Sequence, residues 1–467
     1  MELKKTIYMK KIKDNSLSKL LIDKKVCVMG LGYVGLTLAV TLADVGFEVL
    51  GVEIRDDVLK LLRSGEPHFF EPGLKGRLES VINSNKLKLS KKIVKSFNSD
   101  VYIITVGTPI DSSNNVNKKM INNVCREISE FIKDDNLIIL RSTVEVGTTT
   151  NIKNYFKKKN KNIQISFCPE RTIEGKAMIE LRNLPQIVGA ETLEVALRVS
   201  QFFSFITPTV VRVSSNETAE LIKLVDNCQR DVHFALSNEI AEISDKFGVS
   251  CHEVIKSGSL GYPRTDLPMP GPVGGPCLEK DSFILKNGLK KYNYFPSIIM
   301  SSRETNLQQP KKSVELLKIF SNKYFKSYPK RITLAGLAFK GNPETDDLRG
   351  SMFKPILKEI RKKFKNSEII LYDKLVNIHN LKKDLKTSNY KFTNSLEESF
   401  VDSSLYIICN NHNEFSSMPV TVLTKKMKTP ALLFDYWNNF SNQKIHFPKG
   451  VKYIGLGEIG KNLKGLT

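Results

Sequence analysis

Cys277 is the residue of this chain whose setting points most directly to chemistry. It stands in the segment Gly-Pro-Val-Gly-Gly-Pro-Cys277-Leu-Glu-Lys-Asp281, directly after a small, flexible turn. If the residues after the turn open a helix, its N-terminus favours the thiolate form of Cys277, and Asp281 lies one helical turn on, on the same face. A thiol that ionises beside a carboxylate is a credible nucleophile and base. A buried structural cysteine is the alternative for an isolated residue of this type.

A nucleotide cradle near the N-terminus is the first element that can position a substrate for such a pair. A short apolar run precedes Gly30-x-Gly32-x-x-Gly35, an amphipathic segment follows, and a second strand leads to Glu53. Gly30 permits the tight turn, Gly32 lets the backbone approach a pyrophosphate, and Gly35 allows close helix–strand packing. Glu53 suits the ribose hydroxyls of NAD and repels the 2′-phosphate of NADP, although the nearby Arg55 could accommodate that phosphate. NAD is therefore the predicted cofactor.

Further strands end in polar loops, and ligands of open α/β sheets lie outside the carboxyl ends of the strands. By that rule Thr108 and Thr143 point at the cofactor, with helix or turn capping as the alternative. Another strand leads into Glu170, a carboxylate at a strand end and hence an active-site candidate.

The segment 216–247 lacks proline and has helical periodicity, with Lys223 and Asn227 four residues apart on one face. A solvated lysine on an ordinary helix is the alternative for Lys223. A long helix in mid-chain also favours pairing of two subunits. The apolar stripe expected to be buried on this helix consists of Leu221, Leu224, Val225, Cys228 and Val232.

After residue 327 the pattern returns to strands separated by helical segments. Strands are expected within 330–340, 369–373, 404–409 and 431–435, which predicts a second parallel sheet. This part has no second GxGxxG, so its expected ligand is not a second NAD. The fold class is therefore α/β, with two Rossmann-like doubly wound domains joined by a long central helical dimerisation region.

Composition sets limits on location and partners. The chain has 467 residues, enough for two or three domains, and no apolar run of membrane-spanning length or secretory signal, which predicts a cytoplasmic protein. Its seven cysteines form no CxxC pair and its six histidines no cluster, so reduced thiols and no metal site are expected. The net charge of +22 comes from scattered lysines without a nucleic-acid motif. No nucleic-acid or membrane partner is therefore expected, and the positive field suits anionic substrates such as nucleotides.

Taken in order, these motifs resemble the nucleotide-sugar 6-dehydrogenases, the family that includes UDP-glucose, UDP-N-acetylhexosamine and GDP-mannose dehydrogenases. The resemblance runs from about residue 25 to beyond 435. Its most specific motifs are GLGYVGL (30–36), EPGL (71–74), STV (142–144), PERTIEG (169–175), ELIKLVDN (220–227), GGPCLEKD (274–281) and AFKGNPETDDLR (338–349). The domains that it implies are a basic extension (1–24), an NAD-binding Rossmann domain (25–212), a central helical dimerisation domain with the cysteine loop (213–327) and a C-terminal UDP-sugar-binding domain (328–467).

The resemblance implies four-electron oxidation of the C6 hydroxyl of a UDP-sugar to a uronic acid, with two NAD, for surface polysaccharide biosynthesis. Cys277 would attack the intermediate aldehyde to form a thiohemiacetal, whose oxidation gives a thioester that water hydrolyses. Lys223 and Asn227 match residues that stabilise developing oxyanions and hold water. Asp281 and Glu170 match residues that manage protons and water.

The resemblance also implies two sets of binding residues and a homodimer or higher homo-oligomer. The cofactor set is Gly30, Gly32, Tyr33, Val34, Gly35, Glu53, Arg55, Thr108, Thr143 (which also matches an active-site threonine) and Arg349. The UDP-sugar set is Glu170, Arg171, Glu174, Lys223, Asn227, Arg264 (expected to reach the neighbouring subunit's site), Gly274, Phe339 and Lys340. No metal is implied.

The sugar and the alternatives depend on finer features. Arg171 after Glu170, and the segment before Cys277, favour a UDP-N-acetylhexosamine, either GlcNAc or ManNAc, whereas Glu174 is shared with UDP-glucose enzymes. Two other hypotheses are a two-electron NAD dehydrogenase, which leaves Cys277 unexplained, and a nucleotide-sugar-binding protein without catalysis, which leaves the set of candidate catalytic residues unexplained.

Three positions depart from the family's pattern. A late strand ends in Asp435-Tyr436-Trp437 where Asp-x-Arg is usual, so an arginine that contacts substrate is expected to be missing. Glu53 replaces the commoner aspartate, and Glu145 stands where a proline is usual after STV.

Overall fold

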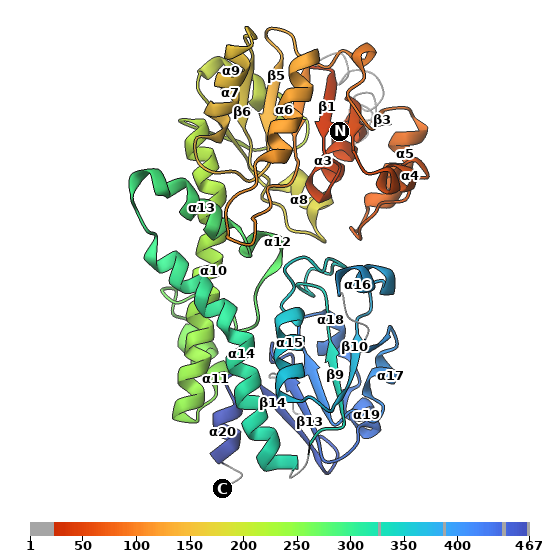
Figure 1. The fold of residues 1–467 in the computed structure, drawn as a ribbon, viewed down its shortest axis with the longest axis vertical. Coiled ribbons are helices and arrows are strands. Elements are labelled where there is room, and N and C mark those ends of the chain that lie inside the picture. Colours follow the sequence, from red (N-terminus) through yellow and green to blue (C-terminus); the bar gives the residue numbers. More distant parts are fainter. Residues whose placement is uncertain (1–22, 326–327, 386–388, 441–444, 465–467) are drawn as a thin grey trace, which may run out of the picture. The chain divides into compact units, whose positions relative to one another are not determined.

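The computed structural model describes residues 23–325, 328–385, 389–440 and 445–464. These residues form two compact units (Figure 1). The first unit runs to Asp226 and includes Phe283–Tyr294, and the second contains Asn227–Ser282 and the chain from Phe295 onward. Within the described part of the chain, no helix is long and apolar enough to cross a membrane.

The first unit is built on an eight-stranded sheet in the order β3-β2-β1-β4-β5-β6-β7-β8. All neighbouring strands are parallel except β6 and β7. The first six positions have the strand order of a dinucleotide-binding Rossmann fold. The strands are β1 (Lys25–Met29), β2 (Glu48–Val52), β3 (Leu87–Ser90), β4 (Val101–Ile104), β5 (Leu137–Leu140), β6 (Gln164–Phe167), β7 (Gln186–Ala190) and β8 (Val210–Val213).

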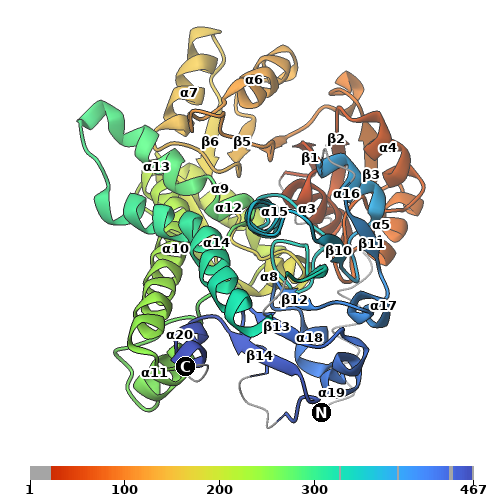
Figure 2. The same cartoon turned by 60° about the horizontal axis from the view of Figure 1, so that its bottom comes forward.

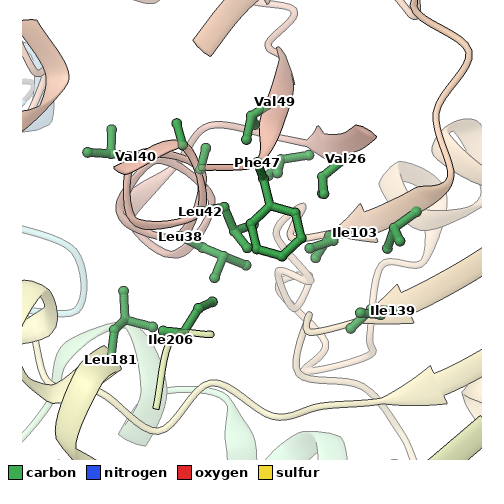
Figure 3. Packing of buried hydrophobic residues seen from close by; sticks show 14 of the residues in the cluster. Val26, Leu38, Val40, Leu42, Phe47, Val49, Ile103, Ile139, Leu181 and Ile206 are labelled. Atoms are coloured by element: carbon green, nitrogen blue, oxygen red, sulfur yellow. The ribbon is translucent and has the colours of Figure 1, made fainter. Parts of the chain in front are cut away.

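Helices cover both faces of this sheet, so its central strands are buried throughout. In β1, Val26 and Val28 belong to one core cluster, whereas Cys27 and Met29 belong to the cluster on the other side. Figure 3 shows part of the first cluster, with the ring of Phe47 among its aliphatic neighbours. The helices of this unit are α3 (Tyr33–Asp44), α4 (Asp56–Arg63), α5 (Leu74–Asn83), η1 (Lys95–Phe97), α6 (Lys119–Phe131), α7 (Thr148–Lys158), α8 (Ala177–Asn183), α9 (Leu193–Ser204) and η2 (Lys290–Tyr292).

The second unit is built on a six-stranded sheet in the order β11-β10-β9-β12-β13-β14, with all neighbours parallel. Numbered from its own first strand, this is again the order 3-2-1-4-5-6. The strands are β9 (Arg331–Ala335), β10 (Glu368–Tyr372), β11 (Lys391–Thr393), β12 (Leu405–Ile408), β13 (Ala431–Asp435) and β14 (Val451–Gly455). The predicted fold class of two Rossmann-like units is therefore confirmed.

Two long helices accompany the second sheet. Helix α14 lies alongside the later part of α10, as both views show (Figures 1 and 2), and Lys312 of α14 pairs with Glu242 of α10 at 2.8 Å. The two long helices are α10 (Asn216–Phe247) and α14 (Ser297–Phe325). The others are α11 (Cys251–Ser259), α12 (Gly275–Leu278), α15 (Phe353–Lys363), α16 (Ile378–Asp384), α17 (Leu396–Phe400), α18 (Asn413–Ser417), α19 (Val420–Leu423), η3 (Thr424–Lys426) and α20 (Ile459–Lys464). Helix α13 (Asp281–Leu289) begins in this unit, and its residues from Phe283 onward belong to the first.

The bounds of α10 agree with the predicted helix, but its expected buried stripe is wrong in part. Leu224 and Cys228 are buried, as expected. Leu221 and Val225 are each 43% exposed. The apolar band of α10 is wider than the surface that this chain's own core covers.

Candidate active site

The glycine turn after β1 has the geometry that its sequence predicts. Gly30 has φ of 94°, and its N–H donates to the carbonyl of Val52 at the end of β2. A Cβ added at Gly35 would lie 1.8 Å from the carbonyl oxygen of Gly30, whereas one added at Gly32 would meet nothing within 4 Å. Gly32 is the N-cap of α3 and provides no side-chain cap for the first N–H groups of the helix. This turn fits a dinucleotide pyrophosphate.

Tyr33 links the glycine turn to the Pro-Glu-Arg segment of the same unit. Its hydroxyl accepts a hydrogen bond from the N–H of Gly175 at 2.7 Å. Glu71, from the EPGL motif, accepts from the same N–H at 2.7 Å and from that of Met178 at 3.3 Å. The buried carboxylate of Glu71 therefore holds the 169–175 loop beside the start of α3.

Glu53 and Arg55 follow β2 and have different partners. Glu53 is half-buried and accepts hydrogen bonds from the N–H groups of Leu31 and Arg55, at 3.1 and 3.0 Å. The exposed guanidinium of Arg55 forms an ion pair with Asp57 at 2.6 Å, and this hydrogen bond lowers the pKa of Asp57 to about 2. Arg55, which could have accommodated the 2′-phosphate of NADP, is thus already paired with Asp57, and this pairing favours NAD over NADP.

Thr108 and Thr143 lie together at the ends of β4 and β5. The hydroxyl of Thr108 donates to the backbone carbonyl of Thr143 at 2.6 Å, and Thr108 is 2% exposed. The two strand-end loops are therefore joined to each other.

Glu170, after β6, is a buried carboxylate that is neutralised by Arg141. The two side chains form an ion pair, and the other oxygen of Glu170 accepts from the N–H groups of Arg171 and Thr172, both at 2.9 Å. Burial alone raises the pKa of Glu170, but the charge and hydrogen bond of Arg141 outweigh it, and the charge of Lys223 adds to them, so the pKa is lowered. Glu170 is therefore an ionised hydrogen-bond acceptor at neutral pH.

The first turns of α10 are anchored to the same unit, which fixes the position of Lys223. Buried Asn216 accepts from the N–H of Phe167 in β6 at 2.8 Å. Glu220 accepts from the N–H groups of Gly147 and Thr149 at the start of α7, at 2.6 and 2.8 Å. These bonds set the helix beside the strand ends and hold half-buried Lys223 within electrostatic range of Glu170.

Arg171 and Glu174, the other substrate candidates of this unit, lie in the same loop. Arg171 approaches Asp226 of α10 at 3.7 Å and donates to the carbonyl of Pro185 at 2.9 Å. Glu174 is half-buried.

In the second unit, the helix expected after the cysteine turn is divided in two. Half-buried Cys277 is the third residue of the four-residue helix α12, and Asp281 is the first residue of α13. The expectation of one continuous helix is therefore wrong, because the chain turns at Glu279 and Lys280. Cys277 does lie near a helix N-terminus.

Asn227 and Asp281, which are 54 residues apart in sequence, lie in direct contact. The Nδ2 atom of Asn227 donates to Oδ2 of Asp281 at 2.6 Å, and the residues are 6% and 1% exposed. This contact brings together two of the predicted catalytic residues.

Glycines seat the cysteine loop on the loop that follows β9. The N–H of Gly275 donates to the carbonyl of Gly350 at 2.9 Å. A Cβ at Gly274 would lie 2.2 Å from that carbonyl oxygen, and one at Gly275 would lie 2.4 Å from the ring of Phe339. Side chains at these positions would clash with the loop after β9 and displace the cysteine loop from it. Lys340, whose ammonium lies 5.6 Å from the Phe339 ring centre, belongs to the same loop.

The remaining predicted residues of the second unit are more exposed. Arg349 forms an ion pair with Asp347 at 2.5 Å, and its side chain is 61% exposed. It lies in the second unit, whereas the other cofactor candidates lie in the first. Arg264 is exposed and stacks on Tyr262, with 5.3 Å between the guanidinium carbon and the ring centre.

Trp437, where an arginine was expected, packs under the beginning of the cysteine loop. A Cβ at Gly271 would lie 2.9 Å from its ring, and its indole N–H donates to the carbonyl of Cys409 at 3.0 Å. The side chain therefore supports the loop from within the second unit.

Two buried arginines were missed by the sequence analysis. Arg141 pairs with Glu170 and also donates to Gln186 at 2.8 Å. A charged residue directly after the apolar strand β5 was its only sequence signal. Arg303 in α14 has partners about 25 to 72 residues away and no local signal. The part of the chain that the structure describes contains no group of three or more side chains placed to hold a metal ion.

A dinucleotide cradle in one Rossmann unit, and a cysteine loop seated on a second, define an NAD-linked oxidoreductase with a separate α/β domain for its substrate. Family models agree along the chain. They match the NAD binding domain of the UDP-glucose/GDP-mannose dehydrogenase family over residues 24–207, its central domain over 217–308 and its UDP binding domain over 333–442. The chain therefore belongs to the UDP-glucose/GDP-mannose dehydrogenase family and uses NAD.

Individual relatives cover almost the whole chain. A UDP-N-acetyl-D-mannosamine dehydrogenase from Methanococcus vannielii is 31% identical over 442 residues, which cover 93% of this chain and 97% of the relative. The structure of a UDP-D-ManNAc dehydrogenase from Pyrococcus horikoshii has a TM-score of 0.80 and 28% identity, covering 94% of this chain and 100% of that one. The structure of a UDP-N-acetyl-mannosamine dehydrogenase from Staphylococcus aureus has a TM-score of 0.79 and 28% identity, covering 95% and 99%.

Proposed function

We propose that this protein oxidises the C6 hydroxyl of UDP-N-acetyl-D-mannosamine to a carboxylate. The observation that carries this proposal is the similarity over nearly the whole chain to enzymes named for that substrate. Among the two N-acetylhexosamines that the sequence left open, it favours ManNAc over GlcNAc. The contact of Asn227 with Asp281, near the start of α13, supports the catalytic half of the proposal.

Gly30, Gly32, Gly35 and Glu53 would hold NAD, because the turn offers open space, helix N–H groups and a carboxylate for the ribose. When bound, NAD supplies the acceptor for one hydride, and two such oxidations with one water convert an alcohol to a carboxylate, releasing three protons.

Cys277 has the covalent role in the proposed mechanism. Its sulfur adds to the C6 aldehyde as the thiol proton leaves, which forms a thiohemiacetal and retains the reactive aldehyde. Loss of a hydride from this carbon, together with the proton of its hydroxyl group, gives a thioester. Water then adds to the thioester carbon, the C–S bond breaks with its electron pair on sulfur, and Cys277 is restored as the acid is released.

The surrounding residues stabilise charge and move protons. Asn227 donates to Oδ2 of Asp281 and orients this carboxylate, which takes a proton from the thiol or from water. Lys223 and Asn227 supply donors for the oxyanions that form on C6. Glu170, kept ionised by Arg141, orients water as a hydrogen-bond acceptor.

The first experiment measures NADH formed per sugar consumed, with UDP-ManNAc, UDP-GlcNAc and UDP-glucose offered separately with NAD. Two NADH per sugar with UDP-ManNAc, and at least about tenfold lower kcat/KM with the others, is the expected result. A preference for UDP-GlcNAc or UDP-glucose would replace the substrate while keeping the reaction. One NADH per sugar would favour a simple two-electron dehydrogenase, and no turnover with any sugar would favour a binding protein.

We further propose that two copies pair along α10, in the cytoplasm. Five apolar side chains on this helix are 43 to 72% exposed and lie within about 80° of arc at 100° per residue: Leu221, Val225, Leu236, Ile243 and Phe247. A second copy would cover this band, because the chain's own core leaves these side chains exposed. The six buried thiols other than Cys277 fit a reducing compartment. Light scattering of Leu236→Asp/Ile243→Asp should give a monomer, whereas a dimer of this variant would place the contact elsewhere.

A further inference from the structure

Arg303 holds the backbone on both sides of Cys277. It lies in α14 and is 1% exposed. One terminal nitrogen donates to Oδ1 of Asp231 at 2.9 Å and to the carbonyl of Leu278, directly after Cys277, at 3.0 Å. The other donates to the carbonyl of Val273, four residues before Cys277, at 3.2 Å. A single guanidinium thus joins both ends of the cysteine turn to α10.

A second polar contact fixes the beginning of the loop. Asn238 of α10 accepts from the N–H of Gly271 and donates to its carbonyl, both at 3.0 Å. Asn238 also donates to Asn306 of α14 at 2.8 Å, and Asn306 donates to Oδ1 of Asp231 at 2.8 Å. Asp231, Asn238, Arg303 and Asn306 therefore form one buried network, the α10–α14 clamp.

Stability alone does not explain this clamp. All four side chains are 2% exposed or less. Burying an ion pair costs more in desolvation than an apolar pair of similar volume, and replacing such a pair by apolar residues is often neutral or stabilising. Oδ2 of Asp231 and Nε of Arg303 also have no hydrogen-bond partner among the described residues. What the clamp provides is a fixed position for a loop that has glycine at 271, 274 and 275.

We propose that Arg303, together with the rest of the α10–α14 clamp, is a positioning residue that fixes the backbone of Cys277 for addition to the aldehyde. The inference rests on the proposed function. Removal of the first hydride from C6 does not involve sulfur, whereas formation of the thiohemiacetal needs Sγ close to the aldehyde carbon. A displacement of about 1 Å can cost about a hundredfold in rate. Loosening the clamp therefore impairs the second oxidation selectively.

Arg303→Lys is the informative variant, because it keeps a cation beside Asp231. The single ammonium of lysine cannot replace the two terminal guanidinium nitrogens, which donate to the carbonyls of Val273 and Leu278. Asn238→Ala removes both bonds to Gly271 and leaves the ion pair intact. Thr333→Val is the matched control: Thr333 is buried in β9 of the same unit and donates to the carbonyl of Ser399 at 2.8 Å, in the core of the sheet.

Single-turnover measurements with enzyme in excess over UDP-ManNAc, at saturating NAD, resolve the two NADH phases. We expect Arg303→Lys and Asn238→Ala to keep the first phase within about twofold and to slow the second at least about tenfold. Cys277→Ser serves as the benchmark for a lost second phase. Amide hydrogen exchange of residues 271–281, measured without substrate, should rise in both clamp variants and stay at the wild-type level in Thr333→Val.

An unchanged second phase in Arg303→Lys, or equal slowing of both phases, would overturn the positioning role. A second phase slowed as much in Thr333→Val would also overturn it, since any loss of stability would then suffice. One NADH per sugar from the wild-type enzyme would instead remove the proposed function, and the inference with it.

Discussion

The two Rossmann units begin with the same turn and then diverge. In each, a glycine with positive φ follows the first strand, at Gly30 (94°) and Gly336 (83°). Each glycine N–H donates to the last carbonyl of the second strand, at 2.8 and 2.9 Å. Each second strand is followed by an acid, Glu53 or Asp373. In the first unit α3 begins at Tyr33, three residues after the glycine, whereas in the second α15 begins only at residue 353.

The acids show what that difference means. Glu53 is half-buried and accepts two N–H groups. Asp373 is 5% exposed and accepts four, two of them from the turn after β9. The first unit thus keeps a helix N-terminus and a partly accessible carboxylate for a ligand. The second unit uses its acid for its own structure, and it inserts before its helix a loop on which the cysteine turn is seated. Shared topology therefore does not imply a shared ligand, because the segment after the first strand determines whether the unit can bind a dinucleotide there.

Removing the thiol should have the largest effect and should separate the two units functionally. Cys277→Ser is expected to lower uronic acid formation at least about a thousandfold, because the alcohol is a far weaker nucleophile than a thiolate. NAD affinity should stay within about twofold of wild type, because the cradle belongs to the first unit. Product analysis by mass spectrometry and NAD titration by fluorescence check both outcomes. Acid formation at the wild-type rate would exclude Cys277 as the nucleophile.

Substitutions within the glycine turn test whether Gly35 serves helix–strand packing and Gly32 serves NAD binding. Gly35→Ala is expected to destabilise the protein by more than about 4 kcal/mol, because its Cβ would overlap a backbone carbonyl. Gly32→Ala should cost no more than about 1 kcal/mol of unfolding free energy, the loss of a favourable N-cap residue, because a Cβ there meets no protein atom. It should weaken NAD binding at least about tenfold. Chemical denaturation and NAD titration of both variants check this. Equal loss of stability in both would mean that the space at Gly32 is not a ligand site.

Exchanging the two strand-end acids for amides sharpens the comparison directly. Asp373→Asn should cost about 3 kcal/mol of stability, because an NH₂ group replaces an oxygen that accepts two buried N–H groups, and should leave NAD affinity unchanged. Glu53→Gln should show the reverse, with about tenfold weaker NAD binding and little loss of stability. Denaturation curves and NAD titrations of the pair give the test. The same response in both variants would contradict the assignment of one acid to a ligand and the other to the fold.

Local patterns were enough to predict the two α/β units, the bounds of α10 and the glycine turn, because each depends on residues close in sequence. Long-range contacts were not predictable in this way. The direct bond between Asn227 and Asp281 and the clamp around Arg303 join residues from about 25 to 75 positions apart. Their polar side chains look like ordinary surface residues until the helices pack.

The apolar band of α10 illustrates a second limit. Periodicity shows that Leu221 and Val225 lie near the buried face, but it does not show whether the chain itself or another molecule covers them. The same holds for Trp437: the sequence shows that an arginine is absent, whereas only the structure shows an indole packed against Gly271.

The smallest expected effect is a change in stability with pH at Asp245, a carboxylate of the second unit without the four N–H donors that bind Asp373. Burial of Asp245 on α10 raises its pKa to about 6, and the charges of Glu458 and Glu242 act in the same direction. Hydrogen bonds from the N–H groups of Gly460 and Ile459 lower the pKa but do not offset the burial. Because the folded state holds this proton more tightly than the unfolded state, the contribution of Asp245 to stability is greatest below pH 4 and declines as the pH rises through about 6.

Asp245→Asn removes that charge and keeps an oxygen for the N–H of Gly460, which lies 2.9 Å from Oδ1. The variant should therefore be more stable than wild type by about 1 to 2 kcal/mol at pH 7.5, with the difference shrinking toward pH 4.5. Urea unfolding of both proteins across this range measures it, and Glu239→Gln, an exposed change on the same helix, is the control. A difference that grows as the pH falls would reverse the sign of the argument and show that the fold stabilises Asp245 as a carboxylate.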